Sequence, residues 1–445
     1  METERGKITG EVKVSDALFK EVTNILQFKA KIEQFLKANT TELLGIILGG
    51  TVALNASDIH IEPEEERAKL RVRVDGVLQD VLFFDPKLYR ALVSRVKLLS
   101  GLKLNVTNRP QDGRFTILMA ATGEPRLEGR GETVIEIRVS TLPAENGESI
   151  VMRTLNPKNL IEIEALGLRK DLVEVFNREI QRPNGMIIVT GPTGSGKTTT
   201  LYAVLKKINS PDIKIITIED PVEYHVEGLS QTQVDPTKGY TFANGLKALM
   251  RQDPDVILVG EIRDLETSEI ALQAALTGHL VFSTLHTNDA AGAVARLIDL
   301  GVRPVSIAPA INMIVAQRLP RKVCKKCAKL ILPNPKDLEK IKKGLSGVKK
   351  EIIPPNFFEK EFKIPQAVGC LDCNSSGYRG RVGIYETFLV DDDMEKFILT
   401  SPSIVAMRES AIKKGMVLMQ QDGLIKVLEG KTTLDEIERI SGEVE

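Results

Sequence analysis

The apolar residues in the middle of the chain occur as short continuous runs. Between residues 186 and 287, four such runs are separated by longer stretches with helical spacing. A continuous apolar run of this kind is typical of a parallel strand that is buried on both faces. Strands alternating with helices predict an α/β fold whose parallel sheet is covered by helices on both faces. The predicted strands are Met186–Thr190, Ile213–Ile218, Asp255–Gly260 and Gly278–Thr287.

The preceding region shows a different pattern, in which apolar and polar residues alternate. Residues 69–78 and 134–140 alternate in this way, which indicates strands with one buried face. Residues 41–53 and 86–100 have the apolar spacing of helices. We therefore predict one mixed α/β domain over residues 41–155.

The remaining segments are expected to be helical or connecting. Val14–Leu36 has apolar residues at helical intervals, which predicts a packing helix or a short docking element. Pro183-Asn184-Gly185 breaks the chain before the first parallel strand. The predicted divisions are a helical leader (1–40), the mixed domain (41–155), a linker with an approach helix (156–185), a parallel-sheet core (186–320), a cysteine-containing module (321–387) and a C-terminal helical region (388–445).

A glycine-rich stretch follows the first parallel strand and matches the phosphate-loop pattern G-x-x-x-x-G-K-[ST]. Its glycines allow backbone N–H groups to surround phosphate oxygens, and the next helix directs its positive end to the same place. Lys197 would reach the outer phosphates, and the Thr198 hydroxyl would bind Mg²⁺. The alternative is a chance glycine-rich turn, but the flanking strand and helix favour a nucleoside triphosphate site. The predicted binding residues are Gly191, Pro192, Thr193, Gly194, Ser195, Gly196, Lys197, Thr198 and Thr199.

Carboxylates follow the next two strands. Glu219, Asp220 and Glu223 come after the second strand, at the edge where open α/β sheets bind their ligands. These carboxylates would hold Mg²⁺ through water or polarise the attacking water, and the alternative is a polar turn ended by proline. Glu261 follows the third strand, in place of the aspartate that usually ends a Walker B strand. We predict that Glu261 acts on a Mg²⁺-linked water or on the nucleophile.

Histidines and arginines provide further candidates. His279 and His286 flank the fourth strand, where we expect both to lie near the carboxyl-terminal edge of the sheet and to sense the γ-phosphate, or to be structural. Arg318 closes this region and could reach the nucleotide. Arginines at strand ends in the mixed domain are either surface residues or ligands of the triphosphate, namely Arg71, Arg73, Arg114, Arg138 and Arg153.

The four cysteines of the chain form two Cys-x-x-Cys pairs, Cys324 with Cys327 and Cys370 with Cys373. Two such pairs can place four thiolates tetrahedrally around Zn²⁺, so we predict a structural zinc site without an open catalytic position. The 42 residues between the pairs exceed the spacing of a short zinc ribbon, which indicates an insertion. The alternatives are a redox pair, or one structural pair with two free thiols.

The amino-acid composition disfavours nucleic-acid binding and a membrane-spanning segment. Lys+Arg and Asp+Glu both number 60, so no net charge attracts nucleic acid or acidic lipid. Aromatic residues make up 4% and tryptophan is absent, which argues against stacking on single strands. No apolar run approaches the ~18–20 residues that cross a bilayer, and the N-terminus lacks a signal-peptide core. We therefore expect a cytoplasmic protein that does not bind nucleic acid directly.

Eight motifs follow one another along the chain. They are Ala-Ser-Asp-Ile-His-Ile-Glu-Pro (56–63), Arg-Pro-Gln-Asp-Gly-Arg (109–114), Arg-Val-Ser-Thr-Leu-Pro (138–143), the phosphate loop (191–199), Ile-Glu-Asp-Pro-Val-Glu (218–223), Arg-Gln-Asp-Pro-Asp (251–255), Gly-Glu-Ile-Arg-Asp (260–264) and Thr-Gly-His with Ser-Thr-Leu-His-Thr (277–287). Because it carries these motifs in this order, the chain resembles the secretion ATPases of type II secretion and type IV pilus assembly over about residues 41–440. The tetracysteine module and Gly-Arg-Val-Gly-Ile-Tyr-Glu (380–386) favour the assembly and secretion branch over the pilus-retraction branch.

This resemblance implies a PAS-like front domain, a RecA-like core, a small zinc-binding module and C-terminal helices. It also implies a ring of six copies that is held at the inner face of the cytoplasmic membrane through a platform protein. About 40 residues precede the match, fewer than in most members, so docking would use residues 1–40 unless the chain is a truncation. The implied site residues are Arg114 and Arg138 from the front domain, an aspartate box (Glu219, Asp220, Glu223), a Walker B glutamate (Glu261) and a histidine box (His279, His286).

We therefore interpret the chain as a Mg²⁺-dependent ATPase. Hydrolysis of ATP would move its two nucleotide-flanking domains and so drive pilin or pseudopilin assembly. The alternative is a nucleic-acid transfer motor of the conjugation or DNA-packaging type, which zero net charge and few aromatic residues disfavour. A third hypothesis is a nucleotide-gated scaffold without turnover.

Overall fold

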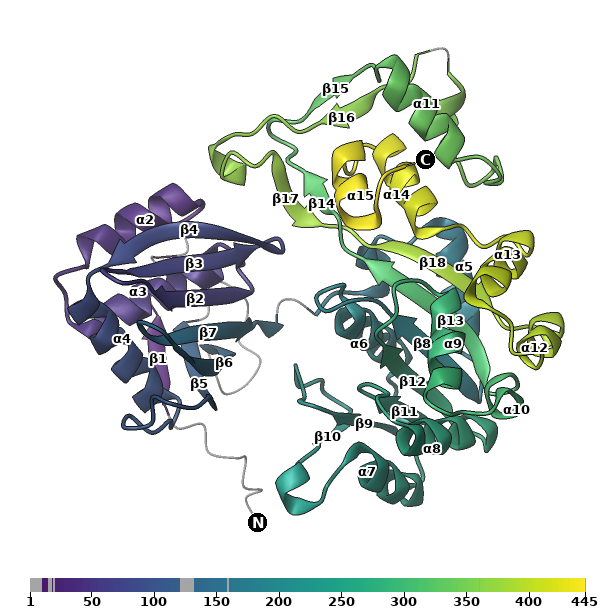
Figure 1. The fold of residues 1–445 in the computed structure, drawn as a ribbon, viewed down its shortest axis with the longest axis horizontal. Coiled ribbons are helices and arrows are strands. Elements are labelled where there is room, and N and C mark those ends of the chain that lie inside the picture. Colours follow the sequence, from purple (N-terminus) through teal and green to yellow (C-terminus); the bar gives the residue numbers. More distant parts are fainter. Residues whose placement is uncertain are drawn as a thin grey trace. The chain divides into compact units, whose positions relative to one another are not determined.

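The computed structural model describes residues 10–14, 18, 21–120, 132–157, 160–359 and 361–444. The chain divides into two compact units, which Figure 1 shows with their helices and strands labelled. The first unit consists of Met1–Pro157 with the short segment Gly369–Gly377, and the second of Lys158–Val368 with Tyr378–Glu445. Each unit is built around one seven-stranded sheet, which matches the predicted α/β class.

The sheet of the first unit has the strand order β1-β5-β6-β7-β2-β3-β4 and is antiparallel except between β1 and β5. Residues of the helices share a core with one face of this sheet. Along β3, Leu70 and Val72 are buried in that core, whereas Arg71 and Arg73 on the other face are half-buried. The elements are β1 (Glu11–Val14), α2 (Ile25–Gln34), α3 (Thr40–Ala53), β2 (Asp58–Pro63), β3 (Ala68–Val74), β4 (Val77–Phe84), α4 (Pro86–Leu99), β5 (Gln111–Ala120), β6 (Glu132–Ala144) and β7 (Gly147–Leu155).

The predicted helical leader is only partly correct. Strand β1 lies within the leader at Glu11–Val14, pairs in parallel with β5, and buries Val12 and Val14 in the core of the first unit. Two buried residues at a spacing of two suit a strand, because alternate side chains of a strand share a face. Helix α2 begins only at Ile25. Leader residues 1–9, 15–17 and 19–20 lie outside the described residues.

The sheet of the second unit has the strand order β10-β9-β11-β12-β8-β13-β18. All neighbouring strands are parallel except β13 and β18. The four strands predicted from continuous apolar runs are confirmed as β8, β9, β11 and β12. The elements are α5 (Lys170–Glu179), β8 (Gly185–Thr190), α6 (Lys197–Ile208), β9 (Ile215–Glu219), β10 (Ser230–Gln233), α7 (Phe242–Leu249), β11 (Val256–Val259), α8 (Leu265–Leu276), β12 (Leu280–Leu285), α9 (Ala291–Asp299), α10 (Pro304–Ile307), β13 (Ile311–Arg318) and β18 (Ile384–Leu389).

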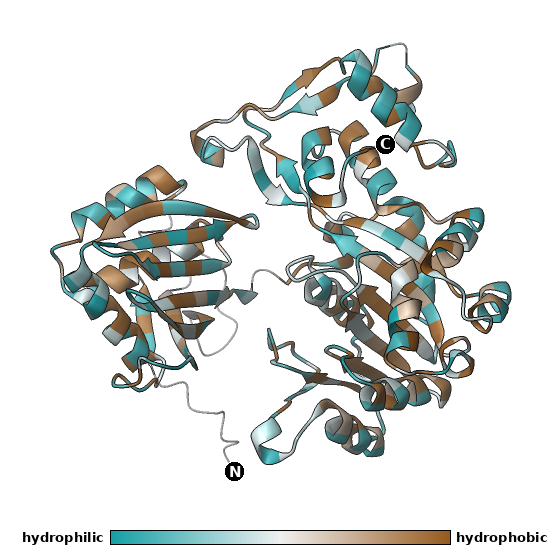
Figure 2. Ribbon diagram, viewed as in Figure 1, coloured by the Kyte–Doolittle hydropathy of each residue, from teal (hydrophilic) through white to brown (hydrophobic). Residues whose placement is uncertain are grey.

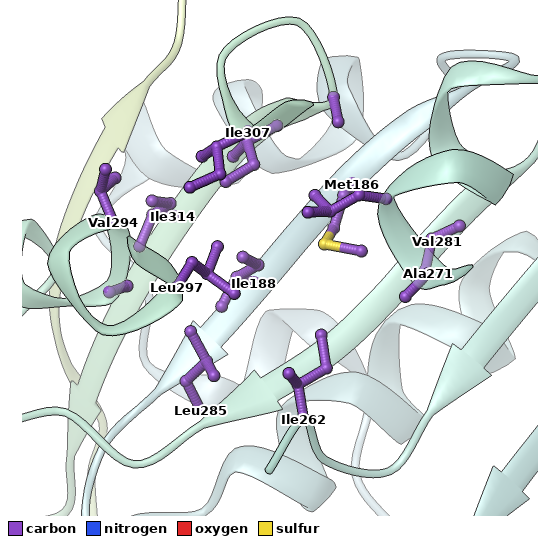
Figure 3. Close-up of a cluster of buried hydrophobic side chains, with 14 of the residues drawn as sticks. Met186, Ile188, Ile262, Ala271, Val281, Leu285, Val294, Leu297, Ile307 and Ile314 are labelled. Atoms are coloured by element: carbon purple, nitrogen blue, oxygen red, sulfur yellow. The ribbon is translucent and has the colours of Figure 1, made fainter. Parts of the chain in front are cut away.

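Both faces of this second sheet are covered. Met186 and Ile188 of β8 belong to a core that includes residues of α8 and α9, and Figure 3 shows these side chains packed together. Ile187 and Val189 of the same strand belong to a second core with residues of α5 and α6. This explains why the strand is continuously apolar, and Figure 2 shows the contrast with the alternating colours of the first sheet.

The C-terminal part combines two-stranded sheets with helices. Ile341 and Ile364, which lie between the cysteine pairs, share a hydrophobic core with Leu424 and Ile437 near the end of the chain. The predicted insertion is therefore packed against the C-terminal helices. The elements are β14 (Arg321–Val323), β15 (Lys329–Ile331), α11 (Pro335–Gly344), β16 (Ile364–Gln366), β17 (Tyr378–Arg381), α12 (Asp392–Ile398), α13 (Ile404–Lys413), α14 (Met419–Leu428) and α15 (Leu434–Ser441). Within the described ranges, no helix is both long and apolar enough to span a bilayer.

Candidate active site

The phosphate loop lies between β8 and α6, as predicted. Gly191, Gly194 and Gly196 have φ values of 151°, 79° and 90°, a region that favours glycine. A Cβ atom on Gly191 would lie 2.6 Å from the backbone oxygen of Gln317, and one on Gly196 would lie 2.8 Å from the Gln317 side-chain nitrogen. The glycines are therefore required both by the loop conformation and by the close approach of β13.

Lys197 begins helix α6 and folds back over the loop. Its Nζ donates hydrogen bonds to the carbonyl oxygens of Gly191 at 2.8 Å and Pro192 at 3.2 Å. Burial lowers the pKa of the Lys197 ammonium group, the charge of Glu261 opposes this shift, and that of Arg318 adds to it. The ammonium group thus lies in the electrostatic reach of both predicted site residues.

Ser195 gives independent support for a ligand at this loop. Its side chain is buried, and its Oγ has no hydrogen-bond partner among the described residues. An unpaired buried hydroxyl is unfavourable unless a ligand or water satisfies it. Thr198 and Thr199 are half-buried, whereas Pro192, Thr193 and Gly194 are exposed. These residues fit a triphosphate with its magnesium ion, because hydroxyls and backbone N–H groups are the donors such a group needs.

Glu261 lies just after β11 and is the carboxylate that the structure connects most clearly to other site residues. One carboxylate oxygen is 3.4 Å from Nε2 of His286, and the other forms an ion pair with Arg263. The Glu261 side chain is 15% exposed, which leaves it accessible to a small ligand. We did not predict Arg263 as a site residue, although its place two residues after Glu261 in the same strand-end motif was a usable signal.

The three carboxylates at the end of β9 lie in different surroundings: Glu219 is the last residue of the strand, and Asp220 and Glu223 follow it. Glu219 is buried and accepts hydrogen bonds from Tyr202 at 2.5 Å and Thr217 at 2.6 Å. Burial raises the pKa of the Glu219 carboxyl group, and the hydrogen bonds partly oppose that shift. Asp220 is more exposed and lies 3.9 Å from Arg263, while Glu223 is half-buried. The structure therefore links Asp220 rather than Glu219 to the surroundings of Glu261.

One predicted placement is wrong. His279 precedes β12, whereas His286 follows it, so the two histidines lie at opposite ends of a six-residue strand. At about 3.3 Å per residue, these ends are roughly 20 Å apart. His279 instead contacts the carbonyl oxygen of Ala274 at 3.0 Å through its Nδ1. Sequence proximity misled the prediction, because a strand separates its flanking residues along its full length.

Arg318 ends β13, next to the phosphate-loop strand β8. Burial lowers the pKa of its guanidinium group, and the charge of Asp289 opposes this shift. Its NH2 group lies 3.4 Å from both the backbone and the side-chain oxygen of Asn288. These are long contacts, so a phosphate oxygen could compete for the same N–H groups.

The predicted arginines of the first unit stand in a row. Arg114 on β5 is directly opposite Arg138 on β6, which is opposite Arg153 on β7. Their strand neighbours Phe115 and Ile137 point into the core, so the arginines occupy the other face of the sheet. The expectation that Arg114 stands at a strand end is wrong, because β5 extends from Gln111 to Ala120 and Arg114 lies within it. A contact of Arg114 or Arg138 with the nucleotide stays a prediction.

The four cysteines come together. Their Sγ atoms all lie within 4.8 Å of one another, and none forms a disulfide. The Sγ atoms of Cys370 and Cys373 are 3.7 Å apart, close to the ~3.8 Å expected when both bind zinc with bonds of about 2.3 Å. Cys373 also accepts hydrogen bonds from the backbone N–H groups of Cys370 at 3.1 Å and Gly377 at 3.3 Å. Such bonds stabilise a thiolate, so the donor set fits a metal ion of the zinc type.

Comparison with known proteins gives consistent matches over nearly the whole chain. Residues 34–439 match the family described as Type II/IV secretion system protein. Type II secretion system ATPase E of Vibrio cholerae is 43% identical over 431 residues, which cover 96% of this chain and 80% of that protein. Type IV pilus assembly ATPase PilB of Myxococcus xanthus is 40% identical over 431 residues, which cover 97% of this chain and 72% of that protein.

Several solved structures are also similar to this chain. The pilus retraction motor PilT with bound ADP is 27% identical, with a TM-score of 0.57 over 89% of this chain and 96% of that chain. The ATPase DotB of Legionella pneumophila is 22% identical, with a TM-score of 0.61 over 90% of this chain and 95% of that chain. At that identity the second match supports the fold alone.

Proposed function

Because this chain belongs to the type II/IV secretion system protein family and is a type II secretion or type IV pilus assembly ATPase, we propose a role in ATP binding or hydrolysis for each of its site residues. The observation that supports it best is the pair formed by Glu261 and His286 at the edge of the sheet that also carries the phosphate loop. This edge is where open α/β sheets bind their ligands. The energy of ATP hydrolysis there would drive assembly of pilin or pseudopilin subunits.

In this proposal the loop binds the phosphates. Backbone N–H groups of residues 191–199 and the Lys197 ammonium group would hold the outer phosphates once Lys197 leaves the Gly191 and Pro192 carbonyls. Thr198 and the unpaired Ser195 hydroxyl would face Mg²⁺, with Asp220 and Glu223 acting through water. A magnesium ion held by these residues would supply positive charge that offsets the charge developing on the phosphate oxygens.

Glu261 would orient the attacking water. A carboxylate that is partly buried beside a histidine can accept a hydrogen bond from water and direct it at the γ-phosphate. His286 would sense the same phosphate, and Arg318 would bind it. Glu219, whose carboxylate is already bound by Tyr202 and Thr217, would hold the turn that presents its acidic neighbours.

The remaining parts of the proposal concern assembly. Arg114 and Arg138 would contact the nucleotide from the first unit, so that hydrolysis changes how the two units engage each other. The chain would act as a homo-hexamer at the inner face of the cytoplasmic membrane, bound there through a platform protein. Zn²⁺ held by the four thiolates would be structural, because no ligand position is left for a substrate.

The first test compares two glutamates. Glu261→Gln keeps the size of the side chain but removes the acceptor charge, and we expect ATP turnover to fall by about 100-fold or more with melting temperature unchanged. Glu266→Gln is the matched control, because Glu266 is exposed on α8 and forms an ion pair with the surface residue Lys247 at 2.5 Å, so turnover should be unchanged. Equal turnover in both variants would contradict the role of Glu261.

Two further measurements test the assembly and metal proposals. ATP turnover should rise when the cytoplasmic part of a platform protein is added and should not rise with DNA. Stimulation by DNA alone would favour a nucleic-acid motor instead.

The metal proposal is tested by metal analysis, which should find about one zinc per chain. The Cys373→Ser substitution should lower this zinc content. A zinc content below about half an equivalent in the unmodified chain would exclude the structural zinc site.

A further inference from the structure

The five residues after β12 connect several parts of the second unit. Each residue from 286 to 290, which we call the 286–290 segment, has a partner on a different element. The pairs are His286 with Glu261, Thr287 with Thr190, Asn288 with Arg318, Asp289 with Arg408, and Ala290 with Glu386. The segment thus joins the phosphate-loop strand and the Glu261 site to C-terminal elements that the proposed chemistry does not use.

Asp289 is the charged residue of this segment and lies near two arginines. Its carboxylate forms an ion pair with Arg408, which stands on α13. Its other oxygen accepts a hydrogen bond from the backbone N–H of Gly292 at 2.7 Å. The charge of Asp289 also acts on Arg318, where it opposes the effect of burial on the guanidinium pKa. One carboxylate is therefore within electrostatic reach of two guanidinium groups.

Arg318 in turn lies close to the phosphate loop. Gln317, its neighbour on β13, packs against Gly191 and Gly196, and its side chain accepts a hydrogen bond from Thr200 at 2.8 Å. The hydrogen bonds of Arg318 to Asn288 are both 3.4 Å long, which leaves its N–H groups weakly engaged. A carboxylate and a phosphate would compete for the same planar donors.

We propose that Arg408 is a positioning residue for nucleotide binding. By holding Asp289 in an ion pair, Arg408 keeps that carboxylate from pairing with Arg318 and leaves Arg318 free to bind a phosphate oxygen. The inference rests on the proposed contact of Arg318 with the nucleotide. Because Arg408 stands on α13, a displacement of this helix would let Asp289 pair with Arg318 and weaken binding. The C-terminal helices would then influence the affinity for the nucleotide.

The test uses the full chain, a fluorescent ATP analogue and the KM for ATP. Arg408→Ala should weaken binding and raise KM by about three- to tenfold, the effect of one partly exposed ion pair, with little change in kcat. Asp289→Asn keeps the hydrogen bond to Gly292 but removes the competing charge, so its affinity should match the unmodified chain. The double variant should also match the unmodified chain, and Arg408→Lys should retain most of the affinity.

Lys414→Ala is the matched control. Lys414 follows α13 and pairs with Asp391 at 2.7 Å, away from the 286–290 segment. We expect its removal to leave both affinity and KM unchanged.

The double variant separates positioning from general support of the fold. If Arg408 merely stabilised α13, removing the Asp289 charge would not restore affinity, and a double variant as weak as Arg408→Ala would overturn the proposal. Unchanged affinity in Arg408→Ala would overturn it as well, while the proposed nucleotide site would stand. Failure of the unmodified chain to bind the analogue would instead overturn the proposed site together with this inference.

Discussion

The two seven-stranded sheets place their polar residues in different ways. In the second unit, Lys197, Glu261 and His286 lie beyond the carboxyl ends of strands whose own residues are buried on both faces. In the first unit, Arg114 and Arg138 lie within strands, on the face opposite the core. The candidate functional residues therefore lie at one edge of the second sheet and on one face of the first sheet.

Because of this difference, the effects of a substitution on stability and on activity should be easier to separate in the first sheet than in the second. A strand that is buried on both faces has no residue that can change without altering a core, so its functional residues must come from the loops. A sheet with one polar face can change that face while its core stays intact. We expect substitutions on the polar face to change activity more than stability, and substitutions within the second sheet to do the reverse.

The largest expected effect is Phe282→Ala in β12. Phe282 is fully buried between the second sheet and its helices, so the cavity should lower the free energy of unfolding by about 3–5 kcal/mol. Arg153→Ala, on the polar face of the first sheet with a side chain that is 54% exposed, should change it by less than about 1 kcal/mol. Urea denaturation of both variants measures the contrast. Similar losses would show that the two sheets tolerate substitution alike.

A buried ion pair in the first unit should affect stability more than the exposed residues of the polar face do. Lys97 on α4 lies 2.6 Å from Glu148 at the start of β7, and both side chains are almost inaccessible. Lys97→Met should lower the free energy of unfolding by about 3 kcal/mol, because it leaves a buried carboxylate without its partner. Adding Glu148→Gln should recover part of the loss, as a denaturation cycle of the single and double variants would measure. If the second substitution lowers stability further, altered packing around residue 97, rather than the unpaired carboxylate, is responsible for the first loss.

Arg138→Ala tests whether the polar face takes part in catalysis. Loss of one charge-assisted contact to a phosphate should reduce ATP turnover by about tenfold, with the unfolding free energy almost unchanged. Arg71→Ala is the control, since Arg71 lies on β3 and pairs with Asp80 at 3.0 Å. We expect its turnover to be normal. Equal turnover in all three proteins would confine the chemistry to the edge of the second sheet.

The smallest expected effect concerns His60 on the same face of the first sheet. Burial lowers the pKa of its imidazole, although the nearby Asp58 charge opposes the shift. Below about pH 6.5 the unfolded chain would then bind more protons than the folded one, so stability falls as the pH drops through this range. His60→Gln should reduce this loss by less than about 1 kcal/mol between pH 7 and pH 5. Identical pH dependence in both proteins would contradict the assignment.

Local patterns predicted the elements and motifs that depend on near neighbours in sequence. The strand, loop and helix around Lys197 and the alternating strands around Asp75 were predicted because their signals lie within about ten residues. The parallel pairing of β1 with β5 could not be predicted in this way, since it joins Val12 to Ile117 across about a hundred residues. The misplacement of His279 has the same origin, because adjacency in sequence was taken for adjacency in space.

Long-range partners of buried polar groups were also beyond the sequence. Glu386 ends a motif that indicated the assembly branch, yet nothing in the motif shows that its carboxylate accepts hydrogen bonds from Ala290 at 2.9 Å and Met419 at 3.2 Å. Burial raises the pKa of the Glu386 carboxyl group. Such partners become visible only when the fold brings distant elements together.

The core shared by the segment between the cysteine pairs and the last helices has a consequence for how the chain opens. Ile341 and Ile364 are packed with Leu424 and Ile437, so neither part can be exposed to solvent without uncovering the other. Their amide hydrogens should therefore exchange with solvent as one cooperative group. Protein engineering that shortens the stretch between Cys327 and Cys370 would have to refill this core, because its removal exposes apolar surface on α14 and α15.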